Sequence, residues 1–428
     1  MTSPSLPRVA VVAGCRTPFL RIATDYSQIP ARLLGAHLVA EMVERSDIDK
    51  SLIDALVFGQ VVLNPGTPNL AREVVMNANL PTSVDAYSVS RACASSYQSA
   101  VDVILNIQTG NIDIGIAGGV DVMSQPSFSM NKKMTEAIIR SNYSKGSKLK
   151  AFKGIGLKDL MPRQPAIKEP SSDLTMGQAA EKMAKENGIS RDDQDALAHR
   201  SHANASNAWK EGWFDEQVMD VIMAPDYEAV SKDNLVRDNS DLSKYAKLKP
   251  VFDRENGSVT AANSSPLTDG ASAVILMSEN KAKELGLTPL GFIKSHAFAA
   301  IDPNWQMLMG PSFATPKALD NAGLTLKDMD LIDMHEAFAA QVLSNTQAFA
   351  SKSFAQERLN RSKPIGEVDF DKFNVSGSSI ALGHPFAATG TRQLTQMLYD
   401  LKRTGGQFGL ITACAAGGLG AAMIVESA

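Results

Sequence analysis

Cysteine is scarce in this chain, with only three residues among 428: Cys15, Cys93 and Cys414. This number excludes a disulfide scaffold at this length, and the CxxC spacing of zinc or redox sites is missing. Of the six histidines, only His199 and His202 form a close pair, in a stretch rich in Arg, Asp and Asn that is typical of a solvated helix face. We therefore expect no metal site.

Long apolar runs and an excess of positive charge are absent as well. No apolar run approaches the ~18 residues of a membrane span, and a net charge of -4 lacks the basic balance of a nucleic-acid binder. Residues 1–7 do not show the pattern of a secretory signal, and the chain does not end in the peroxisomal Ser-Lys-Leu address. These features predict a bacterial cytoplasmic protein with no nucleic-acid partner.

Two segments of the chain resemble each other. Residues 112–124 (IDIGIAGGVDVMS) and 408–427 (FGLITACAAGGLGAAMIVES) each combine an apolar strand pattern, a glycine pair and a second apolar stretch. Each follows a helix-compatible segment, 94–107 and 389–403, that is preceded by a turn rich in Ser, Gly and Ala. This order indicates a duplicated α/β unit and predicts two mostly parallel sheet halves covered by helices.

The stretch between the two units has a different character. Residues 131–170 lack strong periodicity and carry ten basic side chains against three acidic ones. We interpret 125–172 as a basic inserted loop region, which leaves an N-terminal half (1–124 plus 173–290) and a C-terminal half (291–428). Further strands are expected at 8–13, 55–62, 291–298 and 331–334, and further helices at 31–45, 175–187, 191–211, 316–322 and 336–350.

Cys93 lies where a strand-like run meets small residues and a long helix pattern. At the N-terminus of a helix, unpaired N–H groups and the helix dipole favour a thiolate. The position therefore suits a reactive cysteine, although a buried, inert cysteine is the alternative interpretation of this residue alone.

His384 and Cys414 lie in two loops of small residues. The segment 374–385 (NVSGSSIALGHP) presents His384, which is either a general base or a hydrogen-bonded loop residue. Cys414 opens a glycine-rich turn (CAAGGLG) directly after a strand pattern. This turn does not fit a dinucleotide-binding fingerprint, because no G-x-G-x-x-G opens a helix after a first strand.

Taken together, these segments resemble the thiolase family. The likeness rests on YSVSRACASS around Cys93, NSSPLTDGAS at 263–272, HEAF at 335–338, GHPFAATG at 383–390 and the Cys414 turn. Their order matches that family across almost the entire chain. His335 stands where many thiolases have Asn, and Ala416 stands where many have Gly; both variants are similar to the thiolase subunits of fatty-acid β-oxidation complexes.

The resemblance implies an acyltransferase, a 3-ketoacyl-CoA thiolase of fatty-acid degradation that uses coenzyme A as a substrate and needs no bound cofactor. It implies that Cys93 is the nucleophile and that His384 is the base that activates it. Cys414 would protonate the departing acetyl-CoA enolate and then deprotonate the incoming coenzyme A.

The resemblance also implies supporting residues. The N–H groups of Cys93 and Ala416 would stabilise one oxyanion, and His384 with His335 would stabilise the other. Glu336 would orient these groups. The loop that starts at Asn263 would contact the pantetheine arm of coenzyme A, with Ser265 as the best single candidate, although its composition alone indicates an ordinary turn.

Three other functions remain open at this point. A biosynthetic acetoacetyl-CoA thiolase would have the same residues, because the chemistry is reversible. A ketoacyl synthase would pair its cysteine with two histidines or with His and Asn, and Cys414 argues against it. A non-catalytic structural subunit of a multienzyme complex would be expected to have lost Cys93, His384 or Cys414.

The resemblance implies protein partners too, namely a second copy of the chain and an α-subunit with hydratase and 3-hydroxyacyl-CoA dehydrogenase activities. Residues 131–170 then form either a solvated loop that covers the core or a surface that binds a partner. As a surface, their charge suits the phosphates of an acyl-CoA, an anionic membrane in peripheral contact, or that α-subunit.

Overall fold

The computed structural model describes residues 6–143, 147–163, 165 and 168–428. No helix among these residues is long and apolar enough to cross a membrane. The strands are β1 (Val9–Arg16), β2 (Leu20–Arg21), β3 (Ala55–Gly59), β4 (Asp85–Val89), β5 (Ile114–Asp121), β6 (Val221–Ile222), β7 (Ala229–Val230), β8 (Thr268–Ser278), β9 (Gly291–Ala300), β10 (Leu331–Met334), β11 (Phe408–Ala415) and β12 (Leu419–Ser427).

The α-helices are α1 (Ala31–Arg45), α2 (Leu70–Asn77), α3 (Ser95–Gln108), α4 (Lys132–Tyr143), α5 (Leu157–Leu160), α6 (Met176–Glu186), α7 (Arg191–Lys210), α8 (Leu242–Tyr245), α9 (Glu279–Glu284), α10 (Gly310–Ala322), α11 (Ala339–Ala350), α12 (Lys352–Leu359), α13 (Ser379–Leu382) and α14 (Thr389–Thr404). A 3₁₀ turn, η5 (Phe386–Ala388), precedes α14.

One sheet runs through the molecule in the order β10-β11-β12-β9-β1-β8-β5-β3-β4. β3 is parallel to β4 and β5, and β10 is parallel to β11, whereas β8 and β12 are antiparallel to their neighbours. Except for β8 and β12, the strands on this path therefore share one direction within each half, which confirms the predicted α/β fold with mostly parallel halves. The halves join where β1 pairs antiparallel with β9.

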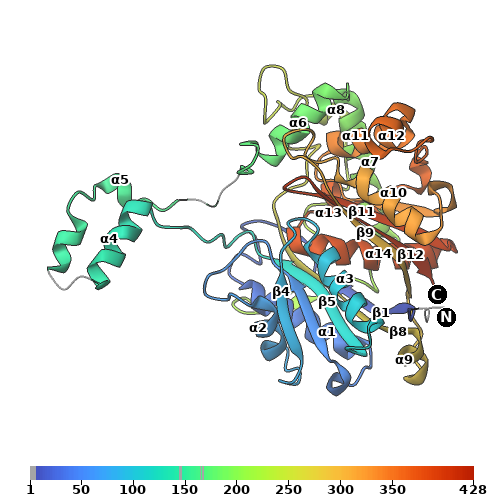
Figure 1. The fold of residues 1–428 in the computed structure, drawn as a ribbon, viewed down its shortest axis with the longest axis horizontal. Helices are drawn as coiled ribbons and strands as arrows, with labels where there is room; N and C mark the ends of the chain where they lie inside the picture. Colours follow the sequence, from blue (N-terminus) through green and yellow to red (C-terminus); the bar gives the residue numbers. More distant parts are fainter. Residues whose placement is uncertain (1–5, 144–146, 164, 166–167) are drawn as a thin grey trace.

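Helices cover both faces of this sheet (Figure 1). α1 and α2 pack on the N-terminal half, and α10 packs on the C-terminal half with α11 beside it. α3 and α14 contact each other in the middle, in a hydrophobic cluster to which both halves contribute. Two helices at equivalent places in the two halves thus form the centre of the molecule.

Polar contacts hold α3 and α14 together. The hydroxyl of Tyr97 donates to Oε1 of Gln393 at 2.8 Å, and the N–H of Thr391 donates to Oγ of Ser96 at 3.1 Å. α14 ends at Thr404, and the next residue, Gly405, has a φ of 70° in the left-handed region that glycine adopts without strain. The N-terminal ends of the two helices are therefore fixed relative to each other.

The basic insert stands away from the sheet and contains α4 and α5 (Figure 1). Its two connecting segments pair where Ser129 and Arg163 exchange N–H···O bonds of 3.0 and 2.7 Å. The insert was expected as an irregular loop region, but α4 is a regular helix that buries Ala137 and Ser141, one turn apart, on the same face. Large apolar side chains nevertheless stay exposed around it: Phe128, Met130, Ile139, Tyr143, Leu149, Leu157, Leu160 and Met161.

Candidate active site

Cys93 lies in a strained turn between β4 and α3, directly before the helix, as the sequence predicts. Ala92 has a φ of 45°, a conformation that costs free energy for a residue with a side chain. Ser95 holds the turn: its hydroxyl donates to the carbonyl of Ala92 at 2.7 Å and accepts from the N–H of Arg91 at 2.8 Å. The fold thus fixes the backbone on both sides of Cys93.

Burial raises the pKa of Cys93 to about 12, although the N–H groups of Ala416 and of Cys93 itself act on the sulfur in the opposite direction. The sequence indicates that this helix N-terminus favours a thiolate, but burial outweighs its effect on Cys93. The resting group is a thiol. A nearby base has to remove its proton before the sulfur can react efficiently.

Two buried imidazoles lie beside this thiol. The ring centroids of His335 and His384 are 4.0 Å apart, and one nitrogen of each ring and the Cys93 sulfur all lie within 4.8 Å of one another. Each Nδ1 is occupied, by Ser379 Oγ at 2.7 Å and by Thr389 Oγ1 at 2.5 Å. Both Nε2 atoms are buried and have no hydrogen-bond partner among the described residues, so they are free to meet a ligand.

Both imidazoles are neutral at physiological pH. Burial, reinforced by the Arg392 guanidinium, lowers the pKa of His384 to about 3. Burial also lowers the pKa of His335 well below its usual range, and His384 and Arg392 add to this effect. The Nε2 atom of His384 can therefore hold a free lone pair at neutral pH.

Cys414 lies near the end of β11, in the hairpin that β11 forms with β12. It is buried in a cluster with Met307, Met309 and Phe338. Burial, together with the proximity of Cys93, raises the pKa of its thiol well above the usual range. The site therefore holds two protonated thiols that lie close enough to influence each other.

Glu336 connects the segments that surround the two imidazoles. Its carboxylate accepts hydrogen bonds from Ser201 Oγ at 2.6 Å, Asn374 Nδ2 at 2.7 Å and the N–H of Ile380 at 3.2 Å. Burial raises its pKa to about 7 despite these donors. The carboxylate links α7 to the loop that carries His384, which fits an orienting role.

A cavity of about 510 Å³ lies beside the predicted coenzyme A loop. Ser265 lines it, together with Ser264, Pro266 and Leu267 from the same loop, Phe252, and Ile380 from α13. Arg21 and Arg237 also line it and are exposed, so they suit the phosphates of a nucleotide. The sequence reasoning missed both arginines, because they lie far from any motif.

Asn263 is buried beneath this loop rather than in the cavity wall. Its amide donates to Asp195 Oδ1 at 2.9 Å and to the carbonyl of Ser258 at 3.2 Å, and its oxygen accepts from the N–H of Thr260 at 2.7 Å. These bonds leave its side chain little capacity for a ligand. We therefore assign Asn263 to holding the loop and keep Ser265 as the proposed contact.

The pair His199 and His202 does not form the solvated helix face that the sequence indicates. His202 is only 2% exposed and accepts from the N–H of Arg237 at 3.2 Å. His199 is half-buried and bonds Ser240 Oγ at 2.9 Å. α7 contacts α8, α11 and α13, and the two histidines do not lie on its exposed side, so the prediction was wrong.

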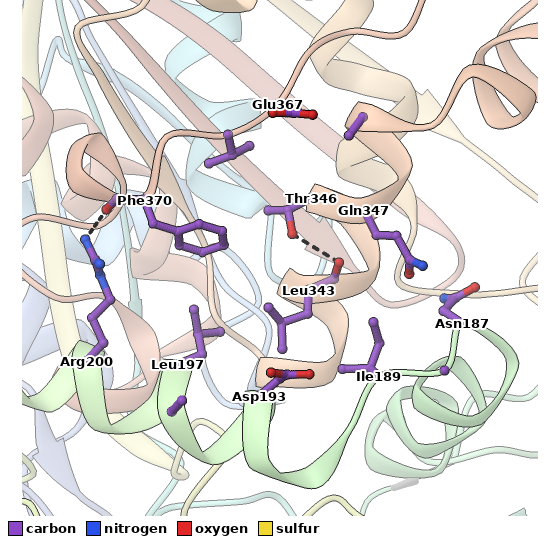
Figure 2. Close-up of a pocket in the computed structure, with 14 residues that line it drawn as sticks. Asn187, Ile189, Asp193, Leu197, Arg200, Leu343, Thr346, Gln347, Glu367 and Phe370 are labelled. Carbon is purple, nitrogen blue, oxygen red and sulfur yellow. Dashed lines mark hydrogen bonds between the residues drawn. The ribbon is translucent and has the colours of Figure 1, made fainter.

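A larger cavity of about 690 Å³ opens elsewhere, between α7, α11 and residues 367–370. Figure 2 shows apolar Leu197, Leu343 and Phe370 at its centre, with Asp193 and Glu367 at its edges. None of the catalytic candidates lines it. The position of the thiols and imidazoles, rather than cavity size, therefore locates the candidate site.

Cys93, His335 and His384 are also the one group of side chains in the described part of the chain that is spaced to hold a metal ion. One thiolate and two imidazoles are ligand types that Zn²⁺ accepts. A metal bound there would occupy the sulfur of Cys93. The same atoms therefore suit either a metal or nucleophilic catalysis, but not both together.

Comparisons with known proteins cover the whole chain. Residues 9–280 match the family model "Thiolase, N-terminal domain", and residues 287–427 match "Thiolase, C-terminal domain". The chain is 56% identical over its full length to a 3-ketoacyl-CoA thiolase of Shewanella sp. strain ANA-3, of which it covers 98%. It is 56% identical, over 98% of its length, to the 3-ketoacyl-CoA thiolase of Shewanella oneidensis, of which it covers 97%. A crystal structure of the Bacillus anthracis acetyl-CoA acetyltransferase superposes with a TM-score of 0.85 at 30% identity, and each chain is covered completely.

Proposed function

This chain belongs to the thiolase family and is an acyltransferase, and we propose that it cleaves 3-ketoacyl-CoA with coenzyme A to acetyl-CoA and a shortened acyl-CoA in fatty-acid β-oxidation. One observation carries this proposal. A half-buried thiol lies beside two buried imidazoles whose Nε2 atoms have no partner among the described residues. Unpaired buried polar atoms are costly unless a ligand meets them.

In the proposed first half-reaction, Cys93 attacks the 3-keto carbon while His384 takes its proton. The bond between C2 and C3 then breaks, which leaves the shortened acyl group on Cys93 and the enolate of acetyl-CoA. Cys414 gives its proton to C2 of this enolate. The N–H groups of Cys93 and Ala416 already converge on the Cys93 sulfur, a suitable position for binding the C3 alkoxide.

The second half-reaction returns Cys93, His384 and Cys414 to their starting protonation states. The Cys414 thiolate takes the thiol proton of incoming coenzyme A, whose sulfur attacks the acyl carbon on Cys93. The Cys93 sulfur leaves as thiolate and regains its proton from His384. Because protons pass only between these groups and the substrates, we propose that the reaction needs no metal and no bound cofactor.

The cavity lined by Ser265 is the proposed binding place for coenzyme A. Its apolar wall suits the pantetheine arm, and Arg21 and Arg237 suit the phosphates. The loop is tied directly to the catalytic residues: the N–H of His384 donates to Thr268 Oγ1 at 3.0 Å, and the N–H of Ser265 donates to the carbonyl of Ala337 at 2.9 Å. A ligand seated there would therefore act on the position of His384.

The basic insert supports a proposal about partners. Residues 131–170 carry an excess of seven positive charges, and large apolar side chains around α4 and α5 are exposed. Exposing these apolar side chains to water costs free energy if the insert is only a solvated loop. The combination of charge and apolar surface therefore favours binding to an anionic, partly apolar partner. We keep an acyl-CoA, an anionic membrane surface and a hydratase/dehydrogenase α-subunit as the candidates.

We also propose that the chain forms a homodimer and acts in the cytoplasm. β4 is the end strand of the sheet, and one of its edges lacks a strand partner among the described residues. An exposed strand edge is a ready surface for pairing with a second copy.

The second candidate function is biosynthetic condensation of two acetyl-CoA molecules. The structural likeness to the acetyl-CoA acetyltransferase of Bacillus anthracis favours it, whereas the higher identity to 3-ketoacyl-CoA thiolases favours cleavage of longer substrates. Coenzyme-A-dependent loss of 3-ketoacyl-CoA, measured from acetoacetyl-CoA to long chains, tests both. We expect cleavage to extend to long chains; activity confined to acetoacetyl-CoA would favour the biosynthetic function, and no cleavage at any length would contradict both.

A further inference from the structure

The two imidazoles of the site are held by hydroxyl groups with different surroundings, and we infer that the protein keeps the two rings in opposite tautomers. His335 carries its proton on Nε2, which makes it a hydrogen-bond donor to the substrate. His384 carries its proton on Nδ1, which leaves Nε2 free as a base. This inference deepens the proposed thiolase function and rests on it.

The tautomer of His384 follows from Thr389. The Thr389 hydroxyl donates its single hydrogen to the carbonyl of Pro385 at 3.1 Å. Its oxygen is then left to accept, so the 2.5 Å contact with His384 is an Nδ1–H···Oγ1 bond. The reverse assignment would give up the bond to Pro385 and gain nothing. Since a neutral imidazole has one N–H, Nε2 of His384 has a free lone pair.

The tautomer of His335 follows from Ser379 in the same way, with the opposite result. The Arg392 guanidinium donates to Ser379 Oγ at 3.2 Å, so one lone pair of that oxygen is occupied. The hydrogen bonds of the described residues contain no other acceptor for the Ser379 hydroxyl hydrogen. It therefore donates to Nδ1 of His335 at 2.7 Å, and the proton of His335 is on Nε2. The positive charge of Arg392 favours the same arrangement, because it repels an N–H pointed toward it.

Further hydrogen bonds hold Arg392 itself in place. It is fully buried on α14 and donates to Asp333 Oδ2 at 2.7 Å and to Ser378 Oγ at 3.1 Å. Gln393 Nε2 holds the other oxygen of Asp333 at 2.9 Å. Arg392 and Ser379 are therefore positioning residues for His335, and Thr389 is the positioning residue for His384.

Opposite tautomers match the order of events in the proposed reaction. Before the attack, His335 alone donates to the thioester oxygen, while His384 Nε2 is free to take the Cys93 proton. Once it has taken that proton, His384 also carries an N–H at Nε2. A second donor thus appears when the enolate forms and negative charge reaches that oxygen, which stabilises the charged state more than the substrate.

Neutron diffraction from the perdeuterated enzyme tests the inference without any assay of activity. We expect deuterium on Nε2 of His335 and on Nδ1 of His384. Deuterium on Nδ1 of His335, or on Nε2 of His384, overturns it. If the tautomers are as inferred but no 3-ketoacyl-CoA is cleaved, the proposed function fails while this arrangement stands.

Two rates measured on variants separate positioning from a general loss of structure. Alkylation of Cys93 by iodoacetamide needs the base but no donor to a carbonyl oxygen, whereas acylation by 3-ketoacyl-CoA needs both. Ser379→Ala should slow acylation about tenfold or more while alkylation stays within about twofold. Ser378→Ala is the matched control, because it removes a hydrogen bond to the same arginine but none to a histidine, and it should leave the ratio of the two rates unchanged.

Thr389→Val should slow both reactions about tenfold or more, and Thr389→Ser, which keeps the hydroxyl, should restore them. Equal losses of both rates in Ser379→Ala, or no loss in either, contradict the assignment for His335. Unchanged alkylation in Thr389→Val contradicts the assignment for His384.

Discussion

The N-terminal ends of α3 and α14 are equivalent places in the two halves, but they carry different chemistry. α3 begins beside Cys93, whose sulfur is reached by backbone N–H groups, its own and that of Ala416 from the C-terminal half, and which follows the strained Ala92. α14 begins beside His384, whose surroundings are buried polar side chains, among them Thr389 and Arg392.

The two places therefore surround the two proposed catalytic groups in different ways. Backbone N–H groups suit the proposed nucleophile, because they stabilise charge without adding a titratable group. Side chains suit the proposed base, because a hydroxyl or a guanidinium can set the pKa and the tautomer of an imidazole. The following predictions test this division.

The largest effect is expected from the thiols. Cys93→Ala should lower kcat by about 10⁵-fold or more and prevent acylation, because no other group can accept the acyl chain. Cys414→Ala should still accept an acyl group from a simple thioester but turn over about 10²–10⁴-fold more slowly, because proton transfer to C2 is lost. Burst-phase and steady-state kinetics on both variants measure these steps. An acyl burst that survives Cys93→Ala contradicts the assignment.

The next effect concerns the base. His384 has a pKa lowered to about 3, so alkylation of Cys93 in the unmodified protein should depend only weakly on pH between 6 and 9. In His384→Ala the rate should fall about tenfold to a hundredfold at pH 7. It should then rise with pH, because only the thiolate of a cysteine with a pKa of about 12 reacts. Identical profiles for both proteins would show that the surroundings of α3 activate Cys93 alone.

The sequence predicted the strands and helices where local pattern and packing agree. The strand at 331–334 and the helix at 31–45 have the predicted bounds. The helix expected at 316–322 begins earlier, at Gly310, because Pro311 lies in its first turn and Pro316 is accepted inside it. Thr268–Ser278 was missed as a strand, since its first residues read as a turn; pairing with β1 and β5 overrides that local preference.

For the site, the sequence pointed to the residues that we propose to react and not to those that hold them in place. Cys93, His384 and Cys414 stand in recognisable segments of small residues. Arg392 and Ser379 act through a contact between α14 and α13, and spacing along the chain does not reveal such contacts. Whether the recognised residues perform the predicted roles stays a prediction that the experiments here decide.

A smaller effect is expected from Glu336, which frames the base in the C-terminal half. Burial raises its pKa from 4.5 to about 7, so the folded state binds this proton more tightly than the unfolded state does. Its contribution to the free energy of unfolding therefore falls as pH rises from about 5 to 7, by on the order of 1–3 kcal/mol. Glu336→Gln should remove this fall, and urea unfolding of both proteins between pH 5 and 8 measures it.

Glu357→Gln, which changes an exposed carboxylate on α12, is the control and should leave the pH dependence of unfolding unchanged. Parallel curves for the unmodified protein and Glu336→Gln would contradict the assignment of this titration to Glu336.

The smallest effect on the central chemistry is expected from the insert, which lies outside the duplicated halves. Changing Lys148, Lys150 and Lys153 to Glu should leave acetoacetyl-CoA cleavage within about twofold. The same change should weaken long-chain turnover, binding to anionic vesicles or assembly with the α-subunit, most clearly at low ionic strength. Rates, vesicle co-sedimentation and assembly measured at low and high salt separate the three partners.

The matched control reverses three exposed lysines of the C-terminal half, Lys317, Lys327 and Lys352, which changes the net charge equally. If the insert variant and the control behave like the unmodified protein in all three assays at low salt, the insert is only a cover.

The central claim is that Cys93, at the N-terminal end of α3, carries the acyl group. Brief incubation with a long-chain 3-ketoacyl-CoA in the absence of free coenzyme A, followed by acid quenching, digestion and mass spectrometry, tests it directly. We predict the shortened acyl group on the peptide that contains Cys93, and its loss when coenzyme A is added before the quench. A stable acyl group on the peptide of Cys414, with Cys93 unmodified, would contradict the account.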